Sequence, residues 1–173
     1  QSRDLAGLGM LAISADYRVK NRDKTTPFDC VKDGKSAVRW VRKHAAELGV
    51  DPNKIVVAGG SAGGHIAACT GIIEGCEEAG DDLAVSSIPN AMVLFNPVLD
   101  TTEKGYGAKH FKPEQQTEIS PNHHVRKGTA APSEPGSAEL SGVAGVAAGG
   151  EAGVPDSGLG RSATNHTPNS RTV

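Results

Sequence analysis

The sequence predicts an α/β architecture built on a parallel sheet, and three observations carry that prediction. Short apolar runs occur at residues 10–15, 55–58 and 91–95. Segments with helical periodicity lie between these runs, and turn-forming residues bound them. Because strands that alternate with helices are joined by crossover connections, the sheet is expected to be parallel, with helices packed against it.

Each strand has its own signal. Residues 10–15 form an apolar run that ends at Asp16. Residues 55–58 are Ile-Val-Val-Ala, a composition typical of a strand buried on both faces. The third run, at 91–95, is stopped by the pair Asn-Pro.

Three helices are expected, one before the first strand and two between the strands. The first covers residues 2–9 and ends at Gly9, because glycine is a frequent C-terminal stop. The second covers 30–48, where apolar residues recur at spacings of three and four. The third covers 61–78, and its apolar stripe consists of Ile66, Cys69, Ile73 and Cys76.

Composition excludes several classes of protein. A net charge of -2, from 18 basic and 20 acidic residues, favours neither nucleic acid nor an anionic membrane as partner. No run approaches the roughly 20 apolar residues that span a bilayer, so a soluble protein is expected. Three cysteines do not make a disulfide framework, and Cys69 and Cys76 lie about 10 Å apart on the predicted helix.

The chain divides into two parts of different composition, residues 1–127 and 128–173. The second part has 46 residues, of which 27 are Gly, Ala, Ser or Pro, and it contains no aromatic residue. Such a segment buries too little apolar surface to offset its chain entropy, so a disordered tail is expected. It is either a natural flexible linker or tail, or the product of a reading-frame error or another artefact at the C-terminus.

The chemical signal lies where the second strand meets the third helix. Residues 59–63 read Gly-Gly-Ser-Ala-Gly, a G-x-S-x-G motif in the context strand, turn, helix. A nucleophilic serine on such a turn projects its hydroxyl from the sheet, and Gly59 and Gly63 remove side chains that would clash across it. Gly60 completes the turn, and Gly64 lets the helix approach the sheet.

The same turn is expected to supply a hydrogen-bond donor to an oxyanion. The N–H of Ala62, directly after Ser61, is one expected oxyanion donor, at a helix N-terminus with partial positive charge. The alternatives are an ordinary N-cap serine or a phosphate-binding turn. A P-loop is excluded because no G-K-[ST] follows, and the dinucleotide fingerprint fits badly because Ser61 stands where glycine is favoured.

The sequence resembles the α/β-hydrolase esterases of the acetyl-esterase and hormone-sensitive-lipase-like branch. The resemblance covers roughly residues 1–127. It is carried by the elbow and by the segments Ser14–Arg18, Asp33–Arg42, Gly49–Ile55, Asn96–Val98 and Ile119–Pro121.

The resemblance implies an acyl-enzyme mechanism with a Ser-His-Asp triad, of which Ser61 alone maps onto this chain. The family's H-G-G-G oxyanion loop would precede residue 2. Its acid and histidine would follow Lys127, where no D-x-x-V-P or G-H-G-F segment occurs. The expected chain is therefore a partial α/β-hydrolase fold, without the N-terminal strands and the last two strands.

The resemblance also predicts an incomplete sheet. The runs at 10–15 and 55–58 correspond to the family's fourth and fifth strands, which flank a strand that would precede Ser2. Both strands are expected to have unpaired edges, and the chain alone is expected to be unfolded, aggregating or partly ordered.

Several other polar residues are candidates for the site. Asp100 follows the third strand, which makes it a pocket residue or a triad acid. His65 lies one helical turn after Ser61 and is expected to be a packing or surface residue. His123 and His124 form a polar pair, His44 and His110 are expected to be solvated, and no metal site or cofactor is predicted. The resemblance suggests that Arg18, Asp33 and Arg39 form a structural set of ion pairs. For Arg39, the alternative is a place on a solvent-exposed face of its helix.

The predicted function is hydrolysis of small acyl esters, with acetylated carbohydrate as one substrate class. The resemblance implies a serine carboxylic-ester hydrolase, but this chain alone is expected to be inactive because Ser61 is the one triad position that it fills. A catalytically incompetent fragment, a binding module that keeps the turn as scaffold, and a peptidase of the same fold are the alternatives. The residues at the start, Gln1–Asp4, are not a signal peptide and begin part-way through a pattern, so no compartment is indicated.

Overall fold

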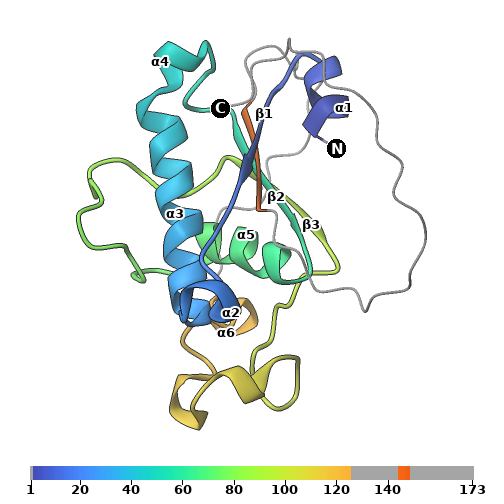
Figure 1. Ribbon diagram of the computed structural model, residues 1–173, viewed down its shortest axis with the longest axis vertical. Helices are drawn as coiled ribbons and strands as arrows, with labels where there is room; N and C mark the ends of the chain where they lie inside the picture. The colour runs from blue at the N-terminus through green and yellow to red at the C-terminus, as the bar shows by residue number, and fades with distance from the viewer. Residues whose placement is uncertain (1, 126–143, 149–173) are drawn as a thin grey trace.

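A computed structural model describes residues 2–125 and 144–148 of the chain (Figure 1). The helices and strands in chain order are α1 (Ser2–Gly7), β1 (Leu11–Ala15), α2 (Lys20–Asp23), α3 (Pro27–Lys43), α4 (Ala45–Leu48), β2 (Ile55–Gly60), α5 (Ala62–Ile72), β3 (Ala91–Phe95), α6 (Pro121–His124) and β4 (Ala144–Ala148). Two 3₁₀ turns, Ala108–His110 and Pro113–Gln115, lie between β3 and α6.

The four strands form one sheet in the order β1-β4-β2-β3, and every neighbouring pair is parallel. This confirms the predicted parallel sheet. Helices α3 and α5 pack beside each other against one face of it (Figure 1). Their shared core with the sheet includes Ile13, Val38, Val41, Ile55, Val57 and Ala67.

The position of β4 corrects the prediction that β1 and β2 lack a common neighbour. Residues Ala144–Ala148 lie between them and pair with both over all five positions. These five residues belong to the segment 128–173 that the composition sets apart. The rest of the predicted tail, 128–173, lies outside the described residues.

Helix α3 begins earlier than predicted and ends earlier. Thr26 and Asp29 form a capping box at its start, with Pro27 in the first turn, so local hydrogen bonds set its N-terminus. The helix stops at Lys43, and the separate turn α4 follows His44. The predicted single helix over 30–48 is thus two.

Helix α5 ends at Ile72, which corrects the prediction of a helix through residue 78. Ile73 has extended backbone angles, and Gly75 and Cys76 both have positive φ, of 72° and 56°. Just beyond this end, Lys35 of α3 donates to the carbonyls of Ile73 and Gly75. Cys69 therefore lies on the helix and Cys76 beyond it, and both are free thiols.

A close approach of α3 to α5 depends on Gly34. A Cβ at this position would overlap Cγ2 of Ile66 and lie 3.3 Å from Cγ2 of Thr70. The missing side chain brings the two helices together. This packing positions the N-terminus of α5 over the end of β2.

Candidate active site

Ser61 occupies a strained turn between β2 and α5. Its backbone angles are φ 52° and ψ −117°, outside the regions that non-glycine residues ordinarily adopt. Two backbone bonds hold it there: its N–H donates to Phe95 O at 3.0 Å, and its carbonyl accepts from His65 N at 3.0 Å. The strain is thus fixed by β3 on one side and by the first turn of α5 on the other.

Glycines make this turn sterically possible. A Cβ on Gly59 would lie 2.8 Å from Gly64 N and still closer to the carbonyl carbon and oxygen of Gly63. A Cβ on Gly64 would lie 3.0 Å from Gly59 O and from two atoms of Pro97. At Gly60 the nearest atom would be 3.6 Å away, which is an ordinary contact. The tight positions are therefore Gly59 and Gly64.

Two cavities meet at the exposed residue Ser61. The larger, of about 480 Å³, lies toward the segment between α2 and α3 and is lined by Tyr17, Thr25 and Ile66, among others. The smaller, of about 350 Å³, lies beyond the end of β3 and is lined by residues 96–100 with Gly105 and Tyr106. A substrate at Ser61 can therefore extend in two directions.

The predicted oxyanion donor Ala62 is the first residue of α5. The first N–H groups of a helix have no acceptor within the helix and carry its partial positive charge. Helix α5 holds no acidic residue in its first turn, so no carboxylate of that turn competes for these groups.

Asp100 lines the smaller cavity together with Ser61. Its Oδ1 accepts hydrogen bonds from the hydroxyl of Thr102 at 2.7 Å and from the N–H of Thr102 at 2.9 Å. These two bonds hold the pKa of Asp100 below its usual value, so the carboxylate is charged at neutral pH. The placement makes it a pocket residue; its role as triad acid stays a prediction.

His65 is a buried packing residue. Its Nε2 lies 2.7 Å from Ile119 O, and Cys69 Sγ is 3.4 Å away. Burial lowers the pKa of His65, which keeps the ring neutral. With Nε2 on the Ile119 carbonyl, this ring secures the 111–124 segment to α5.

The other histidines have partners elsewhere. His123 Nδ1 lies 2.8 Å from Ser120 Oγ, His124 Nε2 lies 2.9 Å from Thr117 O, and His44 stacks on Trp40. His110 is exposed and also lines the larger cavity, a placement that sequence reasoning missed. In the described ranges no hydrogen bond joins a histidine ring to the Ser61 hydroxyl. The predicted position of the base, after Lys127, lies outside those ranges.

Cys30 is a second potential nucleophile in the larger cavity. Burial raises the pKa of its thiol to about 11, and its Sγ donates to Arg18 O at 3.1 Å. A thiol needs its thiolate form for attack, so Cys30 is not a competing nucleophile at neutral pH.

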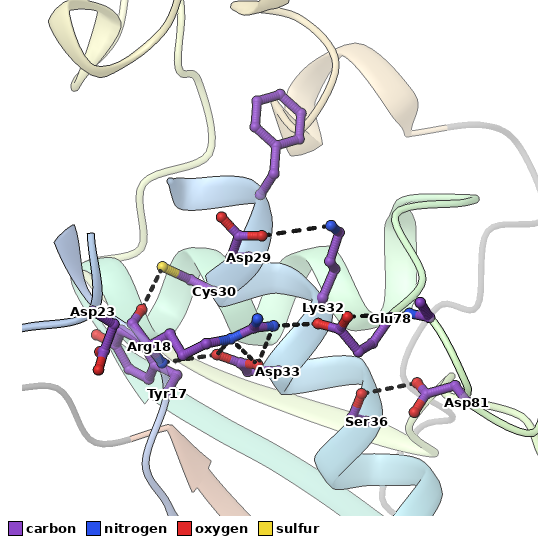
Figure 2. Close-up of polar contacts among 12 residues, drawn as sticks. Tyr17, Arg18, Asp23, Asp29, Cys30, Lys32, Asp33, Ser36, Glu78 and Asp81 are labelled. Carbon is purple, nitrogen blue, oxygen red and sulfur yellow. Dashed lines mark hydrogen bonds and ion pairs between the residues drawn. The ribbon is translucent and has the colours of Figure 1, made fainter. Parts of the chain in front are cut away.

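A charged cluster fixes the segment that follows β1, as Figure 2 shows. The Arg18 guanidinium pairs with Asp33 of α3 at 2.7 Å and with Glu78. The backbone N–H of Arg18 donates to Asp33 Oδ2 at 2.8 Å. This contact secures the backbone beside Tyr17, which lines the larger cavity. Tyr17 could have been identified from its place directly after a strand's carboxyl end.

Arg39 does not join that cluster, which corrects the proposed single set. It pairs instead with Glu77 at 2.6 Å and Asp81 at 3.0 Å, and its Nε donates to Val85 O at 2.9 Å. Arg39 is 8% exposed, so the solvated-face alternative is also wrong.

In the part of the chain that the structure describes, no group of three or more His, Cys, Asp or Glu residues is placed to hold a metal ion. Over that part, no helix has both the length and the apolar character to cross a membrane.

Comparison with known proteins agrees with this geometry. A family described as BD-FAE matches residues 2–130. A probable isoprenylcysteine alpha-carbonyl methylesterase of Arabidopsis thaliana is 38% identical over 84 residues, which are 49% of this chain and 17% of that protein. The carboxylesterase NlhH of Mycobacterium tuberculosis is 44% identical over 63 residues, 36% of this chain and 19% of that protein.

A solved structure resembles the fold more extensively. The apo form of Thermogutta terrifontis esterase 2 superposes with a TM-score of 0.68 and 50% identity, over 73% of this chain and 48% of that one. The same esterase is known phosphorylated by paraoxon, with a TM-score of 0.66 and 51% identity over 74% and 47% of the two chains. The chain thus spans about half the length of this esterase and less of the curated relatives.

Proposed function

Because the chain belongs to the BD-FAE family, whose matched relatives are α/β-hydrolase carboxylesterases, we propose that Ser61 is the nucleophile of carboxylic-ester hydrolysis. The observation that carries this proposal is the exposed serine at φ 52° between β2 and α5, at the junction of two cavities. A strained turn that holds a hydroxyl at the sheet's carboxyl edge is the geometry of a nucleophile elbow.

The proposed chemistry proceeds through an acyl-enzyme. Ser61 Oγ attacks the acyl carbonyl carbon and its proton passes to a general base, while the N–H of Ala62 donates to the developing oxyanion. The tetrahedral intermediate expels the alcohol, which takes up the proton. Water then attacks the acyl-Ser61 carbonyl, and the carboxylic acid leaves with Ser61 regenerated.

The two cavities suggest how an ester would lie. One arm of the ester occupies the cavity beside Tyr17, and the other the cavity beside Asp100 and Tyr106. Volumes of about 480 and 350 Å³ accommodate short acyl chains and a modest alcohol. The proposed substrate class is therefore the small acyl ester, including acetylated carbohydrate.

The general base is the part of this proposal that the described histidines do not supply. His65 is engaged with the Ile119 carbonyl, and His123 and His124 have partners of their own. Ser61 is expected to react with strongly activated esters even without a base, and turnover of ordinary esters is expected to need one. A chain that only acylates, without turnover, is the incompetent-fragment alternative.

Hydrolysis of p-nitrophenyl acetate, propionate and butyrate tests this proposal in the full chain. We expect p-nitrophenol release that is lost in Ser61→Ala and kept in the control Ser86→Ala, which lies in a loop away from both cavities. The matching p-nitroanilides separate a peptidase from an esterase. Equal release by wild type and Ser61→Ala would refute the assignment of Ser61.

A further inference from the structure

The two cavities that meet at Ser61 differ in charge. The smaller cavity is lined by Asp100 and, among the described residues, by no lysine, arginine or histidine. The larger cavity is lined by Lys20 and His110 and, over the same part of the chain, by no aspartate or glutamate. An ester that lies across Ser61 therefore has one arm on an acidic side and the other arm on a basic side.

A tight turn places Tyr106 at the same cavity as Asp100. The N–H of Tyr106 donates to Asp100 O at 2.8 Å, and the N–H of Gly105 donates to Thr102 O at 2.9 Å. A Cβ on Gly105 would lie 2.6 Å from Asp100 Cβ, so the turn closes this far because glycine stands there. Tyr106 is 71% exposed and lines the cavity. The turn thus supplies a carboxylate and an aromatic ring to one cavity that also contains the nucleophile.

One carboxylate oxygen of Asp100 is available to a ligand. Both hydrogen bonds from Thr102 go to Oδ1, and within the described residues Oδ2 has no hydrogen-bond or ion-pair partner in the chain. Lys104 and His123 interact with Asp100 electrostatically, but neither of them lines the cavity. A charged carboxylate therefore lines the cavity without a cation paired to it there.

Aromatic rings attract cations through their faces and are used to recognise quaternary ammonium ligands, and a carboxylate adds its opposite charge. We propose that the smaller cavity is a recognition site for a cationic ester arm, of the quaternary ammonium class, with Asp100 and Tyr106 as the residues that determine this specificity. The preference for cationic esters rests on the proposed role of Ser61 as nucleophile, whereas binding of the cation itself does not.

The charge difference also sets the direction in which such an ester binds. In the larger cavity Lys20 repels a cation, and no carboxylate of the described lining offsets that repulsion. In the smaller cavity Asp100 attracts it. A cationic ester is therefore expected to bind with its charged arm beside Tyr106, while a neutral ester has no such preference.

Two diethyl phosphorothioates that leave the same group on Ser61 test the proposal in the full chain. One has a thiocholine leaving group, and the other has its neutral isostere, 3,3-dimethylbutanethiol. In both reactions Ser61 Oγ forms a bond to phosphorus, the P–S bond breaks, and the thiolate leaves and takes up the serine proton. We expect the ratio of the cationic to the neutral rate to fall about fivefold in Asp100→Asn and about threefold in Tyr106→Leu, and to be kept in Tyr106→Phe.

A second pair of probes carries the cation on the acyl side. These are the p-nitrophenyl esters of trimethylammonioacetate and 3,3-dimethylbutyrate, compared by p-nitrophenol release. The pair whose charged arm enters the smaller cavity should show the preference that depends on Asp100, so the comparison identifies that arm. A preference in neither pair would overturn the proposal.

Asp51→Asn is the matched control for Asp100→Asn. Asp51 Oδ1 also accepts a hydrogen bond from the N–H two residues later, at 2.8 Å, but it lies before β2, at the end of that strand opposite to Ser61. Its rate ratios should equal those of wild type. If Asp100→Asn slows the cationic and neutral probes equally, Asp100 acts in the reaction, as a triad acid does, and its role in cation recognition is refuted.

Choline binding to Ser61→Ala separates a failure of this proposal from a failure of the proposed function. The chain has two tyrosines, so Tyr106→Phe assigns the ring signals of Tyr106 in NMR spectra. We expect choline to shift these signals about fivefold more than 3,3-dimethylbutanol at the same concentration, and Asp100→Asn to remove the difference. Equal shifts would overturn the cation site. Choline binding in a chain whose Ser61 reacts with none of the probes would support the site and refute the nucleophile.

Discussion

The two ends of helix α5 are held by different kinds of contact. At the N-terminus, where Ser61 stands, the chain segments approach so closely that a Cβ on Gly59 would overlap the backbone of Gly63 and Gly64. A Cβ on Gly64 would lie 3.0 Å from Gly59 O and from two atoms of Pro97. At the C-terminus, the 2%-exposed Lys35 donates to Ile73 O at 2.8 Å, to Gly75 O and to Glu77 Oε1 at 2.9 Å. One end is fixed by shape and the other by a buried charge.

This difference suits the chemistry proposed for each end. A cation near the last carbonyls of a helix complements its dipole, so Lys35 stabilises the end that has no chemical role. A charged side chain beside Ser61 would compete for the N–H groups that are expected to bind an oxyanion. Close backbone packing and two backbone hydrogen bonds position the nucleophile, and they leave its surroundings open to the substrate.

Breaking the shape contact is expected to have the largest effect. Gly59→Ala places a Cβ against the backbone of Gly63 and Gly64, which cannot move aside as a flexible side chain can. We expect a loss of about 3 kcal/mol or more in the free energy of unfolding, measured in urea. The elbow should deform as well, so Ser61 should react more slowly in the fraction that stays folded.

Gly60→Ala is the matched control for that change, because its Cβ meets only an ordinary contact at 3.6 Å. It should cost less than about 1 kcal/mol. If Gly59→Ala and Gly60→Ala destabilise the chain equally, the close approach at Gly59 does not hold the elbow.

Removing the charged contact made by Lys35 should have a smaller effect on stability and should leave the reactivity of Ser61 unchanged. Lys35→Met keeps the length of the side chain and removes the three hydrogen bonds, at an expected cost of about 2 kcal/mol in the free energy of unfolding. The rate at which paraoxon modifies Ser61 in the folded fraction should not change. Lys32→Met, which loses only an ion pair at 3.5 Å, is the control. A slower reaction of Ser61 in Lys35→Met would show that the two ends of α5 are coupled.

The smallest expected effect is a pH dependence at the charged end. Burial alone would raise the pKa of Glu77, but hydrogen bonds from Arg39 and Lys35 outweigh it and hold the pKa below its ordinary value. A depressed carboxylate pKa contributes stability above the unfolded value of about 4.3, and this is lost as pH falls through the folded pKa.

Glu77→Gln should therefore be about 1 kcal/mol less stable than wild type at pH 7, and the two should converge below about pH 4. Urea unfolding at a series of pH values measures this gap. A gap that stays constant from pH 7 to pH 3 would mean that the charge of Glu77 does not contribute.

The sequence was most informative where local signals decide the structure. Strand β3 runs from Ala91 to Phe95 as predicted, because polar residues and Pro97 bound its apolar run. Ser61 was identified because the motif and its strand-to-helix context are both local. The end of α5 was not predicted correctly, because Ile73 and Cys76 continue the helical spacing beyond it. The actual stop is set by Gly75 and by Lys35, which is 38 residues away in sequence from Ile73.

Strand β4 and the cavity linings were the least predictable features. Ala144–Ala148 has little intrinsic strand preference, and its pairing depends on two edges far away in sequence. Tyr17, Thr25 and His110 reach one cavity only through the packing of three separate segments. The division of Arg18 and Arg39 into two charged clusters likewise depends on the loop after α5.

Covalent labelling of the full chain with paraoxon tests the central claim most directly, because a structurally similar esterase is known phosphorylated by this compound. Peptide mass spectrometry should place a single diethylphosphoryl group on Ser61, and Ser61→Ala should remain unlabelled. A label on Cys30 or another residue, or a wild-type chain that stays unmodified under conditions that modify the esterase, would contradict the assignment of Ser61 as nucleophile.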